Sequence, residues 1–418
     1  MLMELDDLLI SCMRCGFCQS VCPVYGETFL EADVTRGKIA LLEDLAHELT
    51  ADAEKVNQRL NRCLLCGSCE TNCPSGVSII DIFLRARAVV AGYKGLGLIK
   101  KTIFRFVLPR PRLFNFFIRI SSLFQGPFLK KQSEKPGAFT SPILTPFLGR
   151  RHIPKLSNKS FSSIYGEIDE PSELGKVALF PGCVPDKVFT KLSDTCLKVL
   201  RHHKVGIYLA RDLVCCGIPA LASGDFKAFV ELTKINLDLL AKSSFDYLVS
   251  PCATCASNIK ENWHRFSDSF ESKQSSLIEE ICAKTMDLTA YLVKILRVDL
   301  KPKASDNKVV TYHDPCHLNK SLGVSAEPRE LLKSLPGYQF KEMPEADRCC
   351  GNGGSFNLFN YPISKKIGQV KRDNIVSVKP STVATSCPAC MLQLMDLLSQ
   401  NKDDIEVKHV IELYAETL

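Results

Sequence analysis

Eight of the 20 cysteines in this chain lie near its N-terminus and form two copies of one pattern. Each copy reads C-x2-C-x2-C-x3-C-P; the first ends at Pro23 and the second at Pro74. Paired runs of this kind hold two cubane 4Fe–4S clusters, and the fourth cysteine of each run binds the other cluster. The predicted ligands are therefore a first N-terminal set, Cys12, Cys15, Cys18 and Cys73, and a second N-terminal set, Cys22, Cys63, Cys66 and Cys69.

Zinc and disulfide bonds are the competing explanations for these cysteines. Zinc ribbons use pairs of C-x2-C instead of four-cysteine runs, and 20 cysteines among 418 residues is sparse for a small disulfide-bonded scaffold. The acidic start of the chain does not resemble a signal peptide, and no apolar stretch is long enough to span a bilayer. Because iron-binding thiolates must stay reduced, we expect a cytoplasmic protein.

Ten further cysteines belong to a duplicated unit. Each copy has a single cysteine, a Cys-Cys-Gly and a C-x2-C, and equivalent cysteines are 133, 134 or 135 residues apart. Such constant offsets indicate the duplication of one structural unit. The copies comprise Cys183, Cys215, Cys216, Cys252 and Cys255, and then Cys316, Cys349, Cys350, Cys387 and Cys390. Cys196 and Cys282 belong to no motif and are predicted to be small buried side chains.

Strand-like segments run directly into several of these cysteines. The predicted strands are 176–181, 247–251, 309–314 and 383–386, and they alternate with helical stretches at 188–202, 227–240 and 391–398. This alternation predicts parallel βαβ construction. Because open α/β sheets place ligands at the carboxyl ends of their strands, the five thiols of each copy are expected to meet in one crevice.

The chain is predicted to be an α+β multidomain protein in four parts. Helical periodicity at 34–49 and 78–90 makes residues 1–95 a helical, ferredoxin-type two-cluster module. Residues 96–175 form a basic, phenylalanine-rich helical region followed by an extended linker. Two duplicated α/β domains follow, at 176–300 and 301–418.

The basic region carries the charge excess of the chain, which is +7 overall. Residues 96–131 hold eight basic residues and seven phenylalanines but no Asp or Glu. Basic residues interleaved with aromatic ones suit a membrane surface or an acidic partner. Two amphipathic helices with a phenylalanine core face give the same pattern. Nucleic acid is not expected as a partner, since no recognition fold accompanies the charge.

The duplicated units resemble the cysteine-rich CCG domains of heterodisulfide reductase catalytic subunits and of 2-hydroxy-acid oxidase iron–sulfur subunits. The spacing agrees, with 31 and 32 residues before each Cys-Cys-Gly and 34 and 35 after it. The order of the parts, with Arg36–Gly37 and the CPSG block at Pro74, is similar to the glycolate oxidase iron–sulfur subunit family. Outside 96–175, the resemblance covers essentially the whole chain.

This resemblance implies one non-cubane 4Fe–4S cluster in each CCG domain. The implied ligands are a first CCG set, Cys183, Cys215, Cys216, Cys252 and Cys255, and a second CCG set, Cys316, Cys349, Cys350, Cys387 and Cys390. A structural role or zinc binding in one set is the alternative. The first set is complete here, although many glycolate oxidase subunits lack part of it. That departure brings the chain nearer to the lactate-utilisation and heterodisulfide reductase branches.

The resemblance also implies a function. No G-x-G-x-x-G in a strand–helix context and no P-loop is present, so FAD is expected on a partner dehydrogenase subunit instead of on this chain. The expected protein is the electron-transfer subunit of a flavin-dependent glycolate or D-lactate dehydrogenase. It would have no catalytic residue of its own and would serve an acceptor such as a membrane quinone, as a peripheral protein at the inner face.

Two alternatives stay open from the sequence. One is a heterodisulfide-reductase-type subunit that reduces a disulfide at a CCG cluster. The other is the iron–sulfur subunit of anaerobic glycerol-3-phosphate dehydrogenase. His313 and His317 flank Cys316 and could hydrogen-bond cluster sulfur or relay a proton, although packing beside the site is the more ordinary role for such residues.

Overall fold

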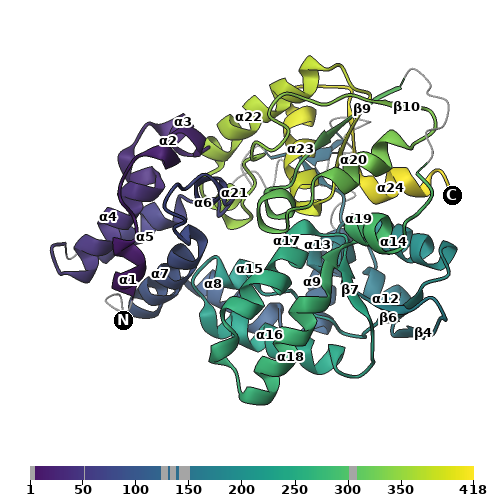
Figure 1. Ribbon diagram of the computed structural model, residues 1–418, viewed down its shortest axis with the longest axis horizontal. Coiled ribbons are helices and arrows are strands. Elements are labelled where there is room, and N and C mark those ends of the chain that lie inside the picture. Colours follow the sequence, from purple (N-terminus) through teal and green to yellow (C-terminus); the bar gives the residue numbers. More distant parts are fainter. Residues whose placement is uncertain (1–4, 51, 124–129, 132–137, 141–150, 301–307) are drawn as a thin grey trace.

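The computed structural model describes residues 5–50, 52–123, 130–131, 138–140, 151–300 and 308–418. A helical N-terminal module lies at one side of two α/β domains, shown in purple at the left of Figure 1. The α+β architecture predicted from the sequence is confirmed. Residues 124–129 of the basic region, which include two of its phenylalanines, lie outside the described residues.

The N-terminal module is helical, and its two cysteine runs fold alike. Gly16 and Gly67, which follow the second cysteine of each run, both have left-handed backbone with φ of 86° and 75°. Each glycine begins a short helix that carries the third cysteine of its run. The helices are α1 (Asp6–Ile10), α2 (Phe17–Val21), α3 (Tyr25–Thr28), η2 (Glu31–Asp33), α4 (Thr35–Ala46), α5 (Ala53–Asn61), α6 (Ser68–Thr71) and α7 (Ile79–Lys94).

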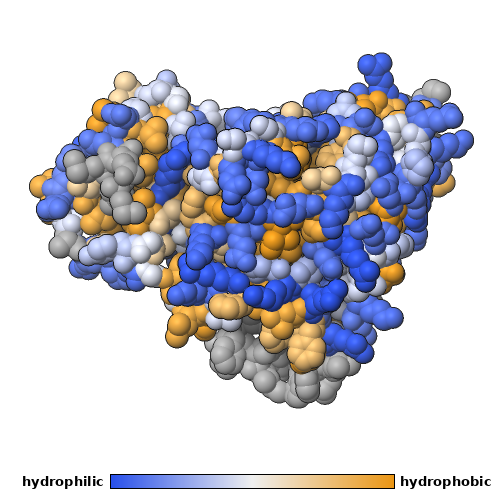
Figure 2. All heavy atoms as spheres, turned by 90° about the horizontal axis from the view of Figure 1, so that it is seen from below, coloured by the Kyte–Doolittle hydropathy of each residue, from blue (hydrophilic) through white to orange (hydrophobic). Residues whose placement is uncertain are grey.

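The basic region forms helices that are only partly covered. It comprises α8 (Leu98–Thr102), the π-helical turn η3 (Ile103–Val107) and α9 (Pro111–Leu123). Phe104 is buried, whereas Phe106 and Phe116 are more than half exposed. Figure 2, a view from below, shows several separate apolar areas on a largely polar surface. Among the described helices, none is long and apolar enough to cross a membrane.

The segment that follows contains more structure than an extended linker. Strands β1 (Lys130–Lys131), β2 (Ala138–Thr140) and β3 (Ile153–Pro154) form a small antiparallel sheet. Helix α12 (Phe161–Tyr165) and strand β4 (Ile168–Glu170) come next. Strand β4 pairs antiparallel with β6 at the edge of the first α/β sheet. A mostly polar, proline-punctuated sequence did not reveal this edge strand.

The two α/β domains repeat one sheet topology. The first sheet has the order β4-β6-β5-β7-β8 and the second has the order β10-β9-β11-β12, with every pair parallel except β4–β6. Without β4 the two orders are equivalent, as duplication requires. The strands are β5 (Lys176–Leu179), β6 (Gly206–Leu209), β7 (Tyr247–Ser250), β8 (Thr285–Asp287), β9 (Lys308–His313), β10 (Tyr338–Phe340), β11 (Thr382–Thr385) and β12 (Glu406–His409).

Helices pack around both sheets and begin where the sequence supplies caps. Asp225 caps α16 by accepting from the backbone N–H of Ala228 at 3.2 Å, and Pro388 starts α23 directly after Cys387. The helices of the first domain are α13 (Cys183–Lys187), α14 (Thr190–His202), α15 (Ile218–Leu221), α16 (Phe226–Leu240), α17 (Ala253–Ser257), η4 (Asn258–Trp263), η5 (Ser267–Ser269), α18 (Ser272–Lys284), α19 (Leu288–Ala290) and η6 (Tyr291–Ile295). Those of the second are η7 (His317–Ser321), α20 (Ala326–Lys333), α21 (Ser355–Phe359), α22 (Tyr361–Ser377), α23 (Pro388–Gln400) and α24 (Val410–Ala415).

Helix α7 docks the N-terminal module onto the first α/β domain. The buried Arg87 guanidinium donates to the carbonyl oxygen of Ala222 at 2.7 Å and to that of Cys63 at 2.9 Å. Beside it, Gly224 has a φ of +85°, and a Cβ there would lie 2.4 Å from the Arg87 carbonyl oxygen. One hydrophobic core runs through this contact, and a second joins the two α/β domains. The loop of the second cysteine run is therefore held against the first α/β domain.

Candidate iron–sulfur centres

The first N-terminal set lines one cavity near the surface. Its four cysteines, together with Cys69, surround this space. Cys15 is exposed, and the other members of the set are partly buried. Arg36 braces the loop of the first run: its Nη1 donates to the Arg14 carbonyl oxygen at 3.5 Å and sits 2.8 Å from where a Cβ on Gly16 would lie. Arg36 of the Arg36–Gly37 block therefore supports the backbone of the first cysteine run.

The second N-terminal set lines a neighbouring, more enclosed cavity. Backbone amides point at two of its sulfurs, from Tyr25 to Cys22 at 3.5 Å and from Leu65 to Cys63 at 3.4 Å. Burial raises the pKa of Cys22 to about 11, so a metal must displace the proton from this thiol. Lys38 is buried in the same cavity, a cation that the cysteine spacing did not reveal.

Both CCG sets face one central cavity of about 220 Å³. All ten of their cysteines line it, and Cys63 and Cys66 of the N-terminal module reach it too. The carboxyl ends of β5, β7, β9 and β11 lead into Cys183, Cys252, Cys316 and Cys387. The expected convergence at strand ends is therefore seen in each domain. The two domains share the space, which the sequence did not indicate.

In both CCG sets, the second cysteine of the adjacent pair is disposed to be a thiolate. Hydrogen bonds from Cys215 and Cys255 lower the pKa of Cys216 well below its usual value. Hydrogen bonds from Cys349 and Cys390 lower the pKa of Cys350 in the same way. Because metals bind the thiolate and not the thiol, both sets present a prepared ligand at the equivalent position.

The sets also contact one another. Cys252 of the first CCG set hydrogen-bonds Cys387 of the second, and the Thr254 hydroxyl lies 3.4 Å from the Cys387 sulfur. On the other side, the thiols of Cys316 and Cys349 hydrogen-bond Cys66, which lowers its pKa well below the usual value. A series of touching sulfurs thus runs from the second N-terminal set through the second CCG set to the first.

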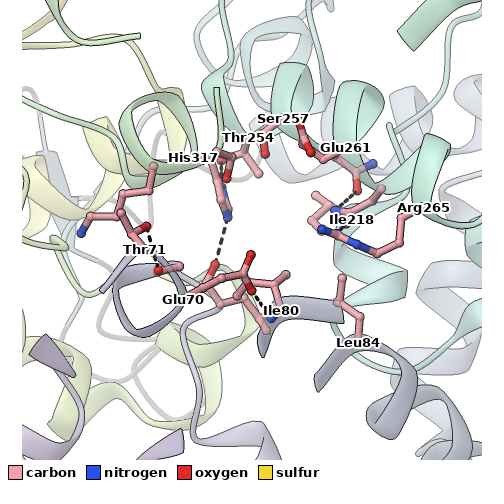
Figure 3. Close-up of a pocket in the computed structure, with 16 residues that line it drawn as sticks. Glu70, Thr71, Ile80, Leu84, Ile218, Thr254, Ser257, Glu261, Arg265 and His317 are labelled. Carbon is pink, nitrogen blue, oxygen red and sulfur yellow. Dashed lines mark hydrogen bonds between the residues drawn. The ribbon is translucent and has the colours of Figure 1, made fainter. Parts of the chain in front are cut away.

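The two histidines near Cys316 have different surroundings. His317 bridges the domains, with Nδ1 3.1 Å from the Thr254 hydroxyl and Nε2 donating to the Leu65 carbonyl oxygen at 3.2 Å. It lies at the wall of a second, polar cavity of about 130 Å³ that Glu261 and Arg265 also line (Figure 3). Its ring nitrogens are therefore occupied by groups other than cysteine sulfur. His313 instead lies buried beside two sulfurs of the second CCG set.

The two cysteines outside every motif lie away from these cavities. Cys196 is buried in α14, and Cys282 is buried in α18, where its thiol donates to the Ile259 carbonyl oxygen at 3.0 Å. All 20 cysteines of the chain are free of disulfide bonds. Their arrangement in buried groups without disulfides fits metal ligation.

Two protein families match the chain in the same places. The family described as a cysteine-rich domain, CCG, matches residues 177–260 and 310–395. The family described as a 4Fe-4S dicluster domain matches residues 9–77. These stretches contain all 18 cysteines of the four sets. The two matches support iron–sulfur clusters as the cofactor of this chain.

Several curated proteins are similar over long stretches. A probable glycolate oxidase iron–sulfur subunit of Bacillus subtilis is 30% identical over 92% of this chain and 88% of its own length. One subunit of the dihydromethanophenazine:CoB–CoM heterodisulfide reductase of Methanosarcina mazei is 26% identical over 100% of this chain and 95% of its own length. Lactate utilization protein A of Geobacillus thermodenitrificans is 31% identical over 57% of this chain and 98% of its own length.

Proposed function

Since this chain belongs to the glycolate oxidase iron–sulfur subunit family, we propose that it is the electron-transfer subunit of a flavin-dependent 2-hydroxy-acid dehydrogenase. The substrate class is glycolate or D-lactate, in keeping with the names of two of its relatives. Oxidation of such an alcohol releases two electrons together, and a flavin converts them to single electrons. The partner is therefore an FAD-containing dehydrogenase subunit, in the cytoplasm or at the inner face of the membrane.

The four cysteine sets are the proposed ligands of this function. The first and second N-terminal sets would each hold a cubane cluster, and each CCG set would hold a further, non-cubane one. When bound, such clusters take up and release one electron at a time. A cavity of about 220 Å³ between the CCG thiols supports a polynuclear group, because a single zinc ion with four thiolates at about 2.3 Å leaves no such space.

The contact of Cys66 with Cys316 and Cys349 is the observation that carries the proposal. It brings a cysteine of the N-terminal module into the second CCG set, so three of the four cysteine sets form one series. Cys69 lines both N-terminal cavities and so brings the first N-terminal set beside that series, and Cys15 of the first set is exposed. Buried cations flank the sulfurs: Lys38 lines the second N-terminal cavity and Arg87 lines the central one. They offset the negative charge of thiolates and stabilise the reduced state.

A disulfide reductase is the second candidate, and one observation favours it. The two CCG sets meet across one cavity, with Cys252 of the first against Cys387 of the second. A disulfide substrate in that space would be within reach of both sets. Reduction of a disulfide consumes two electrons and two protons and yields two thiols, so a site that faces two one-electron centres is suited to it.

The iron content of the anaerobically reconstituted chain tests the cluster assignment. Iron, acid-labile sulfide and EPR spectra would be measured together on the full-length protein. About sixteen irons per chain would support four clusters, and about eight would restrict the clusters to the N-terminal module. Colourless protein that holds only zinc would overturn the proposal.

Two further measurements separate the candidate functions. Gentle co-purification from the source cells should retain a FAD-containing polypeptide if the dehydrogenase proposal is right, and absence of any flavoprotein would count against it. Reduced viologen would be supplied to the purified chain together with a small disulfide. Rapid disulfide reduction by the chain alone would favour the second candidate over a purely electron-transferring subunit.

A further inference from the structure

The two CCG domains differ at one buried position beside their cysteines. His313 ends β9 three residues before Cys316, and Phe180 stands three residues before Cys183 in the first domain. His313 is 0% exposed and Phe180 is 1% exposed. At equivalent positions of the duplicated unit, the second domain therefore has an imidazole where the first has only a hydrocarbon ring.

The His313 ring has no ordinary reason to be buried there. Among the described residues, neither Nδ1 nor Nε2 has an oxygen or nitrogen atom as a hydrogen-bond partner, and the sulfur of Cys350 lies nearby. The polar side chains next to it in the sequence are engaged elsewhere, since Asp314 accepts from Arg329 at 2.9 Å and the Tyr312 hydroxyl lies 3.2 Å from Ser386. Polar groups buried without a partner are rare and costly. The nitrogen that faces the sulfurs can donate to the Cys350 thiolate, or it can bind a group that those sulfurs also hold.

The positions of two sulfurs in the second CCG set indicate that such a group would be a metal. A ring nitrogen of His313 and the sulfurs of Cys350 and Cys390 lie within 4.8 Å of one another. Ligand atoms bound to one tetrahedral metal at about 2.0–2.3 Å are roughly 3.5 Å apart, so a small closure brings all three into range. Hydrogen bonds from Cys349 and Cys390, and then from His313, lower the pKa of Cys350.

We propose that His313 is a nitrogen ligand of the iron–sulfur group in the second CCG set. The two CCG sites are then inequivalent, with thiolates alone in the first and with nitrogen and sulfur together in the second. The inference rests on the proposed function in one respect, namely that the second CCG set holds iron.

Nitrogen hyperfine spectroscopy tests this ligation directly. The full-length chain would be labelled with 15N-histidine, reconstituted anaerobically and studied by ENDOR in its paramagnetic states. We expect a strong histidine 15N coupling in the wild type. His313→Phe, which copies Phe180 of the first domain, should abolish that coupling, and His317→Asn should keep it.

A second variant and the iron content keep the outcomes distinct. His313→Cys supplies another metal ligand, so it should retain the wild-type iron content yet lose the nitrogen coupling. Full iron content with a weak or absent coupling in the wild type, or with a coupling that survives in His313→Phe, would overturn the ligation alone. Wild-type protein with only the iron of the N-terminal clusters would contradict the cluster assignment as well.

Discussion

At the scale of single residues, buried cations lie beside the cysteines and make the local electrostatic potential more positive. Lys38 and Arg87 are almost fully buried against the second N-terminal set, and Lys371 is fully buried near the second CCG set. Burial lowers the pKa of Lys371 to about 8, although the surrounding sulfurs oppose the shift. The burial of each of these positive charges becomes more favourable once thiolates are present. Metal binding, which requires thiolates, should therefore stabilise the folded chain.

His409 is a buried residue whose protonation should limit stability at acid pH. Burial lowers its pKa to about 4, and the neutral ring accepts from the Ile411 N–H at 3.2 Å and donates to the Pro251 carbonyl oxygen at 2.8 Å. The unfolded chain takes up a proton near pH 6.5 whereas the folded chain does not, so this contribution is present at neutral pH and is lost as the pH falls from about 6.5 towards 4.

We expect His409→Asn to remove this pH dependence. From pH 7.5 to pH 5.5 the wild type should lose about 1.3 kcal/mol at this residue, and the variant, whose amide still caps α24, should not. Thermal unfolding at both pH values measures the difference, with His264→Asn at an exposed position as the control. Equal pH dependence in wild type and His409→Asn would contradict the assignment.

At the scale of elements, glycines decide how closely the helices approach one another. Gly217 and Gly351, which follow the adjacent cysteine pairs, have φ of +99° and +88° and pack against Phe229 and the Ser364 carbonyl oxygen. They permit close packing of the protein against itself. Gly224 serves the same purpose between α7 and the first α/β domain.

Gly224→Ala should loosen the docking of α7. Its Cβ would lie 2.4 Å from the Arg87 carbonyl oxygen and 2.6 Å from the Ala91 Cβ, so we expect a loss of roughly 2–4 kcal/mol from overpacking and left-handed strain together. Gly166→Ala is the matched control, because its φ is +66° but nothing lies within 4 Å. Hydrogen exchange should show faster exchange in α7 for Gly224→Ala alone, and unchanged protection would contradict the role of this contact.

At the scale of the whole molecule, three parts of the chain meet around one set of sulfurs. Lys320 of the second domain stands at this junction, where its Nζ donates to the Ser68 hydroxyl of the N-terminal module at 2.6 Å and to the Asp347 carbonyl oxygen at 3.2 Å. Burial would lower its pKa, but the sulfurs of Cys316 and Cys66 raise it. The ammonium group therefore acts on both cysteine sets at once.

Lys320→Met should make both neighbouring centres harder to reduce. A positive charge favours the addition of an electron, so its removal should lower the reduction potentials of the second N-terminal and second CCG centres by several tens of millivolts. Redox titrations followed by EPR measure the shift. Lys198→Met, at an exposed lysine paired with Asp194, is the control and should leave the potentials unchanged. Equal potentials in Lys320→Met and wild type would contradict the placement of this charge.

Much of the fold follows from local patterns. The predicted strands at 176–181, 247–251, 309–314 and 383–386 coincide with β5, β7, β9 and β11, because each is a short apolar run bounded by turn residues. Edge strand β4 was missed, since an edge strand can be polar and carries little periodicity. Lys38 and Arg87 were missed because a basic residue in an amphipathic helix ordinarily faces solvent.

The grouping of the cysteines could be predicted from the sequence alone, because the spacing of the cysteines and the duplication are both visible in the order of residues. The packing of the domains was needed to show that the two CCG sets face one cavity, that Cys66 touches Cys316 and Cys349, and that His313 points at sulfur while His317 does not. Most of these contacts join residues far apart in the chain, and they depend on how packed domains are oriented. No local spacing in the chain encodes that orientation.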